Sequence, residues 1–350
     1  MDMQTQDRSI AVGVVGIGSL GRRLAEQFSR LEDAKLCAIA EVSAERLATT
    51  GDRLGVPAGS RYETLEGMLS SEALDAVGIA TPNGLHHEQV VTALEADCHV
   101  LCEKPLATTA REACDLVDLA TSSDRTVMVG YQRHLNPAFE LARERWATGE
   151  RTPRFITGEI TQDWREHFET MENWRMDPTL SGGGHLLNVG THVIDAILWT
   201  TGLTPTHVTA QMQFADDEQR FDQQSAIILE FKEGGFGTIH DTGMVARTRE
   251  HIHIWDGDGA VYLEGVEWDE RTGYLIDEDG TEHEPYQSYT RDLAKGRAFL
   301  NAITDGTEPP ATVEDGCLAT IVTMGAYESA RRGERIELAQ EFPFAESLLD

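Results

Sequence analysis

Lysine is scarce in this chain of 350 residues, where it occurs at four positions, Lys35, Lys104, Lys232 and Lys295. Lysine and arginine together number 29 against 60 acidic residues, which gives a formal net charge of −31. Such an acidic surface repels a phosphate backbone, so we expect no nucleic-acid partner. At about 1 M salt the Debye length falls to roughly 3 Å and the self-repulsion is screened. The composition therefore predicts a halophilic protein from a salt-loving host.

Long apolar runs and paired cysteines are also missing. No run of about 18 apolar residues occurs, which argues against a membrane-spanning helix. The start, MDMQTQDRSI, lacks the basic and apolar segments of a secretory signal, so we expect a cytoplasmic protein with no membrane partner. The five cysteines form no C-x-x-C pair, and we interpret them as buried free thiols.

The two halves of the chain have different hydrophobic patterns. In residues 1–132, apolar segments such as SIAVGVVGIG and LDAVGIA alternate with amphipathic stretches, which predicts an α/β domain with a doubly wound parallel sheet. In residues 133–350, strand-like segments are joined by the hairpin signals EGG, DGDG and EDG. We expect a second, α+β domain there, with a large, mainly antiparallel sheet. A second copy of the chain could cover the free face of this sheet, which predicts a homodimer or homotetramer.

A glycine-rich turn ends the first predicted strand. Gly16-Ile17-Gly18-Ser19-Leu20-Gly21 has the pattern G-x-G-x-x-G, which permits a tight turn, close approach of a pyrophosphate and a helix N-terminus behind it. Glu41 ends the second predicted strand, where a carboxylate suits the ribose hydroxyls of a dinucleotide. Glu41 would repel a 2′-phosphate, so we predict NAD as the cofactor. Ser43 and Arg46 could receive that phosphate, so NADP is not excluded.

A second unusual stretch is SGGGHLLNVGTHVID, residues 181–195. Asn188, His192 and Asp195 recur at intervals of four and three, which places them near one face of a helix among apolar neighbours. A helix built only for packing would not carry three polar groups there. We interpret Asn188 and His192 as site residues. Asp195 is interpreted as structural, although it could also hold the tautomer of His192.

Lys104 follows a predicted strand in VLCEKPLA, and ligands of open α/β sheets bind at the carboxyl ends of strands. A single E-K-P tripeptide would still be read as a structural turn. Together, however, GVVGIGSLG, TPNGLHHEQVVTALEADCHVLCEKPLA and NWRMDPTLSGGGHLLNVGTHVID resemble the Gfo/Idh/MocA family of dehydrogenases, in the expected order and over nearly the whole chain. The resemblance implies an N-terminal Rossmann domain and a C-terminal domain built on an open antiparallel sheet.

The resemblance also implies roles for particular residues. It makes Lys104 and His192 catalytic and places the segment from Thr81 to His86 along the nicotinamide. Asn188 stands where the family usually has aspartate. An amide, unlike a carboxylate, would not favour the charged form of Lys104, so desolvation could lower the pKa of this lysine more easily. The predicted cofactor-binding residues are Gly16, Ile17, Gly18, Ser19, Leu20, Gly21, Glu41, Thr81, Pro82, Asn83, His86, Glu103 and Lys104.

These interpretations predict an NAD(P)-dependent dehydrogenase that oxidises a hydroxyl group, and the resemblance implies a small sugar, sugar acid or cyclic polyol as its substrate. Either Lys104 or His192 removes the hydroxyl proton, the other hydrogen-bonds the oxygen, and Asn188 orients the substrate. Two alternatives stay open. One is a glycosidase or lyase that uses tightly held NAD for a transient oxidation. The other is a non-catalytic sensor that binds dinucleotide and sugar.

Three further residues are predicted to bind substrate. Arg133 follows the last predicted strand of the first domain and could reach the substrate or the cofactor, or join the domains through a salt bridge. Trp174 and Arg175 precede the glycines of the SGGG segment and are predicted to line the pocket. For Trp174 a role in the core is the alternative.

Other polar residues give weaker signals. Trp164, Arg165 and His167 lie on a segment that could enter the site. His251 and His253 alternate along a predicted strand and so share one face. Two histidines at this spacing could bind a metal ion, but the sequence shows no third ligand, and we predict no metal site.

Overall fold

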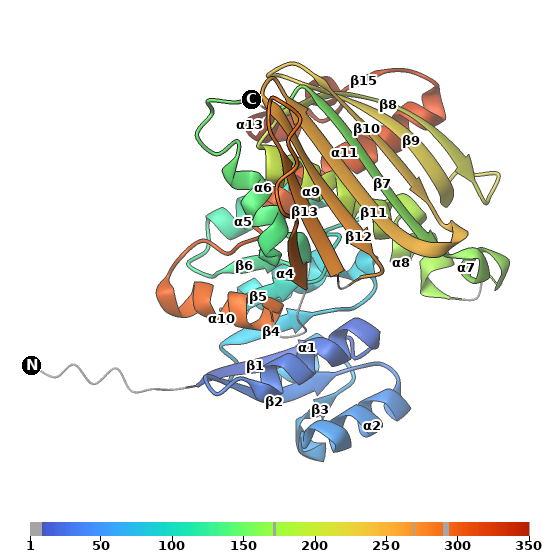
Figure 1. Ribbon diagram of the computed structural model, residues 1–350. Helices are drawn as coiled ribbons and strands as arrows, with labels where there is room; N and C mark the ends of the chain where they lie inside the picture. Colours follow the sequence, from blue (N-terminus) through green and yellow to red (C-terminus); the bar gives the residue numbers. More distant parts are fainter. Residues whose placement is uncertain (1–8, 171–172, 269, 290–293, 350) are drawn as a thin grey trace, which may run out of the picture.

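The computed structural model describes residues 9–170, 173–268, 270–289 and 294–349. Its first sheet has six strands in the order β3-β2-β1-β4-β5-β6, all paired in parallel (Figure 1). The strands are β1 (Ile10–Val15), β2 (Ala34–Ala40), β3 (Arg61–Tyr62), β4 (Ala76–Ile79), β5 (His99–Cys102) and β6 (Val127–Val129). The order in which strands are added reverses between β1 and β4. β2 and β3 lie on one side of β1, and β4, β5 and β6 lie on the other. Sheets of this type bind ligands in the crevice at such a reversal.

Helices connect these strands and cover both faces of the sheet. They are α1 (Ser19–Arg30), α2 (Ala44–Leu54), α3 (Leu65–Ser71), α4 (His86–Glu95) and α5 (Ala110–Thr121). β4 and β6 are buried along their whole length, as expected between two layers of helices. Ser43, Thr64 and Thr109 begin α2, α3 and α5, and each side chain accepts a hydrogen bond from the backbone N–H three residues later. The predicted doubly wound parallel sheet is confirmed.

The second sheet has nine strands in the order β14-β13-β12-β11-β7-β10-β9-β8-β15. All neighbours pair antiparallel except β7 and β10, which are parallel. The predicted large, mainly antiparallel sheet is therefore confirmed. The strands are β7 (Phe155–Asp163), β8 (Pro205–Phe214), β9 (Asp222–Phe231), β10 (Phe236–Thr242), β11 (Met244–Asp256), β12 (Gly259–Val266), β13 (Glu270–Ile276), β14 (Tyr286–Tyr289) and β15 (Ile336–Glu337).

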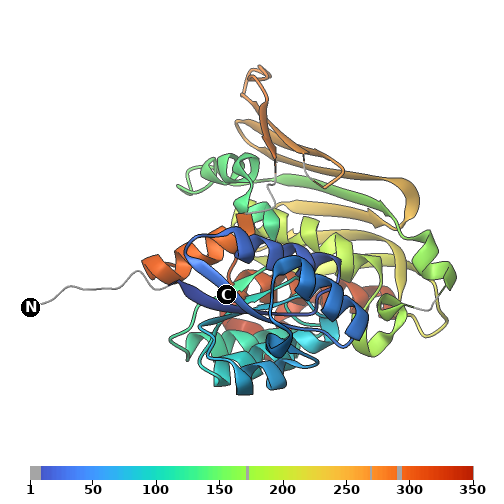
Figure 2. The ribbon, with the colours of Figure 1, turned by 90° about the horizontal axis from the view of Figure 1, so that it is seen from below.

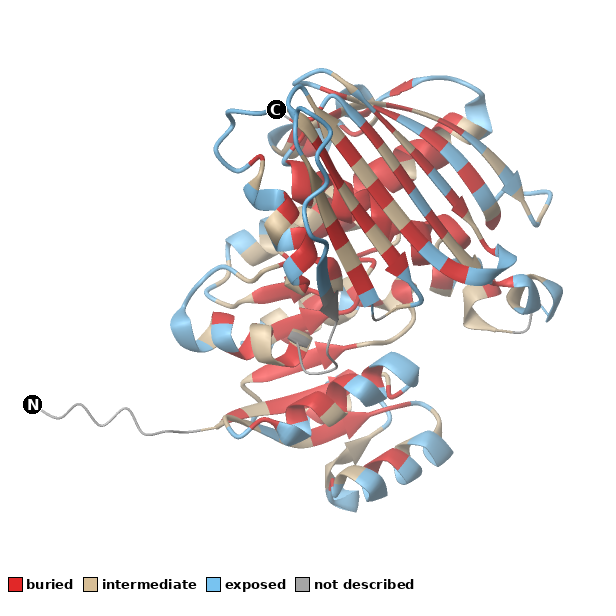
Figure 3. Cartoon of the chain, viewed as in Figure 1, coloured by how far each residue is buried: buried red, intermediate tan, exposed pale blue. Residues whose placement is uncertain are grey.

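Within the described part of the chain, helices cover one face of the second sheet and leave the other face open. The covering helices include α6 (Pro137–Glu144), α9 (Thr191–Thr201) and α11 (Val313–Arg332), and α11 also contacts α5 of the first domain. Along β7, Ile156 and Ile160 are buried on the covered face, whereas Phe155 and Glu159 are exposed on the open one. Figure 3 shows this alternation of buried and more exposed residues along the strands.

One helix of the C-terminal half returns to the first domain. α10 (Ala294–Asp305) lies beside α1, as Figure 2 shows, and the rings of Phe28 and Phe299 meet edge to face with their centroids 6.3 Å apart. The backbone N–H of Gly296 also donates to the side chain of Gln27 at 3.0 Å. The domain division at residue 132 stays a prediction from the sequence.

The SGGG segment is not the single regular helix that its spacing predicts. Leu186–Gly190 forms a π-helical turn, and α9 begins only at Thr191. The wider turn displaces Asn188 from the helical face that carries His192 and Asp195, because the assumed spacing of four residues holds only for an α-helix. The remaining short helices are α7 (Arg165–Thr170), α8 (Pro178–Ser181), α12 (Leu338–Glu341) and α13 (Glu346–Leu349). None of the helices in the described residues is both long enough and apolar enough to span a membrane.

Candidate active site

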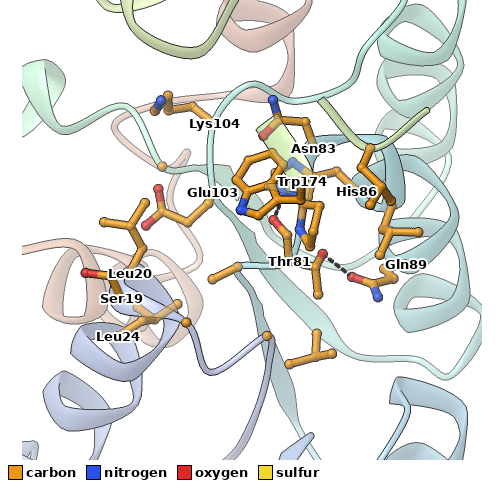
Figure 4. Close-up of a pocket in the computed structure, with 18 of the residues that line it drawn as sticks. Ser19, Leu20, Leu24, Thr81, Asn83, His86, Gln89, Glu103, Lys104 and Trp174 are labelled. Atoms are coloured by element: carbon orange, nitrogen blue, oxygen red, sulfur yellow. Dashed lines mark hydrogen bonds between the residues drawn. The ribbon is translucent and has the colours of Figure 1, made fainter. Parts of the chain in front are cut away.

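A cavity of about 1000 Å³ lies at the carboxyl ends of the first sheet, where that sheet faces the second domain. Its wall includes the glycine turn after β1, the turn after β4, the segment after β5 and the π-helical turn before α9. In Figure 4, Glu103 and Lys104 lie on one side of Trp174, and His86 and Gln89 lie on the other. The motifs singled out in the sequence thus converge on one cavity, although Gly16 and His192, which both line it, lie far apart in the chain.

The glycine turn leaves room for a pyrophosphate. Gly16 has a φ of +81°, and a Cβ at this position would stand 2.7 Å from the backbone of Ala80. A Cβ on Gly21 would lie 1.8 Å from the carbonyl oxygen of Gly16, so only glycine lets α1 pack this closely. Gly18, in contrast, faces open space next to the first turn of α1, whose N–H groups lack partners within the helix. Of the motif, Gly16, Gly18, Ser19 and Leu20 line the cavity, whereas Ile17 and Gly21 support it from behind.

Glu41, which is predicted to bind the adenosine ribose of a dinucleotide, lines the cavity. Its carboxylate is nearly buried and accepts hydrogen bonds from the backbone N–H groups of Ile17 (2.9 Å) and Ser43 (3.0 Å). Arg46 donates to the same carboxylate at 2.8 Å, and its side chain is largely exposed at the cavity rim. The carboxylate of Glu41, predicted to favour NAD, and the guanidinium group of Arg46, which could bind the 2′-phosphate of NADP, are therefore direct neighbours.

Arg46→Ala is expected to raise the KM for NADP⁺ by about tenfold or more and to leave the KM for NAD⁺ within about twofold. The reason is the loss of one charge-assisted hydrogen bond to the 2′-phosphate, which is worth about 1.5–3 kcal/mol. Initial rates with each cofactor measure this, and Arg53→Ala on the same helix α2 is the matched control. An equal change for both cofactors would show that Arg46 does not discriminate between them.

Lys104, the residue predicted to exchange a proton with the substrate, lines the cavity. Its Nζ donates a hydrogen bond to the backbone carbonyl of Asn188. Burial lowers the pKa of Lys104 to about 7, and the nearby positive charges of Arg175 and Lys295 act in the same direction, whereas Glu103 opposes them. A substantial fraction of the amine is therefore neutral near physiological pH, as a general base requires.

Lys295 is a cavity residue that the sequence interpretation missed. It lies in the first turn of α10 and forms an ion pair with Glu103. Both side chains line the cavity. The carboxylate of Glu103, the residue directly before Lys104, thus neutralises the positive charge of Lys295. The one available signal was composition, because lysine is so rare that two of its four occurrences lie in this cavity.

His192 lines the same cavity as Lys104 and is uncharged. Burial lowers the pKa of His192 well below its usual range, and the positive charge of Lys104 adds to the effect. Its Nδ1 has no hydrogen-bond partner among the described residues. The ring centroids of Tyr131 and Trp268 lie 6.0 and 5.7 Å from the centroid of the imidazole, and these rings restrict its orientation.

Asp195 does not hold the tautomer of His192. Its carboxylate instead accepts from Nε2 of His134 at 3.0 Å, deep in the second domain. Burial raises the pKa of Asp195 to about 6, although the neighbouring His134 opposes this rise. The structural interpretation of Asp195 thus matches its contacts.

The side chain of Asn188 holds the glycine segment together. Its amide group donates to the hydroxyl of Ser181 at 3.0 Å and to the carbonyl of Gly184 at 2.8 Å, and its oxygen accepts from Asn83 at 3.1 Å. These contacts occupy much of the amide that the sequence interpretation assigned to the substrate. Asn83 also donates to the carbonyl of Ser181 at 2.9 Å, so it joins the turn after β4 to the second domain. The role of Asn188 at the substrate stays a prediction.

The segment from Thr81 to His86 lies on the cavity wall. Thr81, Pro82, Asn83 and His86 all line it. His86 is buried, with its ring nitrogens 2.7 Å from the carbonyl of Pro105 and 3.0 Å from that of Thr81. It therefore ties this turn to the segment that carries Lys104.

Of the predicted substrate-binding residues, Trp174 and Arg175 line the cavity, as do Trp164 and His167 from the weaker group. Arg133 does not. It is fully buried and forms an ion pair with Glu250 on β11. The predicted alternative was a salt bridge between the domains, but with the boundary placed at residue 132 both partners belong to the second domain. Arg165 likewise lies outside the cavity wall and pairs with Asp163 at 2.7 Å on the surface. Gln162 and Trp268 also line the cavity, and neither carried a sequence signal.

Known proteins similar to this chain are sugar and polyol dehydrogenases. D-xylose 1-dehydrogenase [NADP(+)] of Haloarcula marismortui is 28% identical over 285 residues, which cover 79% of this chain and 78% of that protein. Myo-inositol 2-dehydrogenase of Thermotoga maritima is 24% identical over 343 residues, 94% of this chain and 98% of that protein.

Solved structures share the fold over almost the whole length. Levoglucosan dehydrogenase in complex with NADH and L-sorbose superposes with a TM-score of 0.82 at 21% identity and covers 95% of this chain and 99% of that structure. Residues 10–131 match the family described as an oxidoreductase family with an NAD-binding Rossmann fold, and residues 140–261 match the GFO/IDH/MocA C-terminal domain. Both matches are found in one chain and in this order, so the protein belongs to the Gfo/Idh/MocA family of oxidoreductases.

Proposed function

We propose that the protein is an NAD(P)-dependent dehydrogenase that oxidises a hydroxyl group of a sugar, a sugar acid or a cyclic polyol. The observation that carries this proposal is the pairing of two groups that are wholly or partly neutral, Lys104 and His192, in the cavity that also holds the glycine turn. The relatives named above act on D-xylose and myo-inositol, which agrees with a small polyhydroxylated substrate.

The residues of the cavity divide the chemistry between them. When bound, the oxidised nicotinamide cofactor supplies the acceptor for the hydride that leaves the carbon of the substrate hydroxyl. Lys104 in its neutral form takes the hydroxyl proton and becomes an ammonium group, which the carbonyl of Asn188 then stabilises through the existing hydrogen bond. His192, which is also neutral, hydrogen-bonds the same oxygen as it becomes a carbonyl.

The rest of the wall suits a sugar ring. Trp164, Trp174 and Trp268 give apolar surface, and Arg175 and Gln162 give hydrogen-bonding groups on the side of the second domain. We propose that these residues orient the substrate hydroxyl toward Lys104 and His192.

We further propose that the protein is a halophilic homodimer or homotetramer that assembles through the open face of the second sheet. Exposed apolar side chains on this face, Phe155, Ile228 and Phe236, support the proposal. The net charge of −31 on so acidic a surface supports assembly in high salt, where self-repulsion is screened. The cytoplasmic location stays a prediction.

The test is a rate scan for reduction of NAD⁺ and NADP⁺ at high potassium chloride. The panel holds aldoses including D-xylose, sugar acids and inositols, and formation of the reduced cofactor is followed by its absorbance. We expect steady, stoichiometric reduction with at least one member of the panel. A folded protein that binds the dinucleotide but reduces it with no member of the panel would contradict the proposal.

A further inference from the structure

We propose that His251, His253 and Glu264 form a binding site for Zn²⁺, or a transition-metal ion of similar preference, on the open face of the second sheet. The three residues lie on the neighbouring strands β11 and β12. Ile252 and Ile254, which alternate with the histidines, are buried on the covered face. The site therefore lies on the opposite side of the sheet from the helices, and none of its residues lines the dinucleotide cavity.

Strand geometry brings the three side chains together. Residues two apart in a strand point to the same face, so His251 and His253 stand side by side. The pairing of the strands sets Glu264 directly opposite His251, and Tyr262 opposite His253. A directly opposite pair has Cβ atoms about 4.5–5.5 Å apart and a diagonal pair about 7–8 Å apart, so Glu264 can reach both histidines.

The ligand atoms already face one another. One carboxylate oxygen of Glu264 contacts Nδ1 of His251, and the other contacts Nε2 of His253 at 2.5 Å. One ligand atom from each residue lies within 4.8 Å of the other two. A single ion at the centre of this group can therefore be reached by all three side chains without a change in the backbone.

The chemical identity of the ligands points to zinc rather than to magnesium or calcium. Two imidazole nitrogens and one carboxylate oxygen are a common set for Zn²⁺, and the same set holds iron(II) or cobalt(II). Magnesium and calcium prefer a shell made of oxygen atoms. Three protein ligands leave at least one coordination position open, which water or a group from another molecule can fill.

The surroundings favour a dication and hold the ligands in place. Glu159 on β7 is paired in register with His251 on the side away from Glu264, and its side chain is exposed. A second carboxylate is thus available outside the ligand set. It can offset the positive charge of the bound ion or orient the ring of His251. The ring of His253 packs on Tyr262 with centroids 4.2 Å apart, and the ring of Trp255 meets it edge to face at 5.8 Å, so its orientation is restricted.

The experiment is a titration of the chelator-stripped, full-length protein with Co²⁺ and, separately, Zn²⁺. Potassium chloride at about 1 M screens weak attraction of cations to the acidic surface. Cobalt reports its ligands through its visible absorption, and zinc is measured by competition with the bound cobalt. We expect one ion per chain, no displacement by excess Mg²⁺, and affinity at least about tenfold lower in His253→Ala and Glu264→Gln.

His240→Ala is the matched control, because His240 is exposed on the same face but stands two strands away from the site, on β10. It should bind cobalt as the wild type does. Dehydrogenase activity of each variant reports its folding, since none of these residues lines the cavity. Equal affinity in the wild type, His253→Ala and Glu264→Gln, or displacement of cobalt by Mg²⁺, would show that the three residues form only a hydrogen-bonded cluster.

Discussion

Replacing Lys104 by alanine is expected to lower kcat for hydroxyl oxidation by about 10²–10⁴-fold, the range typical of general acid–base groups. The amine that receives the proton is lost, and the neighbouring His192 keeps only a hydrogen bond to the oxygen. Initial rates of reduced-cofactor formation at saturating substrate measure the effect. Lys232→Ala, which removes a lysine outside the cavity wall, is the control for the general loss of a positive charge.

The pH dependence identifies which group is the base. The pKa of Lys104 is about 7, so its neutral fraction and the rate of oxidation should rise as pH increases through 7. The pKa of His192 lies well below its usual range, so this residue should produce no limb near 7. Lys104→Arg keeps the charge but cannot lose its proton at neutral pH and should be nearly inactive. Activity of Lys104→Ala within about threefold of wild type, with the same limb, would assign the base to another group.

Glu250→Ala is expected to lower the free energy of unfolding by about 3–5 kcal/mol, the cost of leaving a buried charge without its partner. Glu250 is buried in the second domain and binds both Arg133 and Arg271, which are also buried. Burial alone would raise the pKa of Glu250, but the two guanidinium groups outweigh it and lower the pKa to about 2. Unfolding by an ionic denaturant measures the loss of stability. Potassium chloride is lowered as the denaturant concentration rises, so that the ionic strength stays constant.

The matched control for this change is Glu230→Ala. Glu230 pairs with Arg335 at the surface, where such a pair contributes about 0–1 kcal/mol. The contribution of Glu250 should also disappear as pH falls from its ordinary titration range near 4.5 towards 2, because the folded protein binds that proton only at lower pH. A loss for Glu250→Ala no larger than that for Glu230→Ala would mean that water or a rearrangement compensates the two arginines.

Much of the first domain was predictable because its signals are local. The buried strands, the capping residues and the G-x-G-x-x-G turn each act over a few residues, and Gly21 is required by a contact with Gly16 only five positions away. The types of the two sheets were also predictable from local patterns. Strands of the first sheet are continuously apolar, whereas strands of the second alternate between buried and exposed residues. The convergence of Lys104 and His192 on one cavity was expected only through the family resemblance.

Contacts set by strand register and by distant helices could not be predicted. Glu264 joins His251 and His253 through the pairing of β11 with β12, which no spacing in the sequence reveals. Lys295 reaches Glu103 across 192 positions because α10 folds back on the first domain. The π-helical turn misled the interpretation of Asn188, since the predicted face assumed regular α-helical spacing.

The return of α10 also means that the first domain is not built from one continuous stretch of the chain. The chain from residue 1 to 132 contains every strand of the first sheet, yet it lacks Phe299, which packs on Phe28, and Lys295, which lines the cavity. A fragment cut at that position would expose apolar surface and lose part of its own site. A complete dinucleotide domain therefore needs two separate stretches of the chain, residues 1–132 and the segment that contains α10.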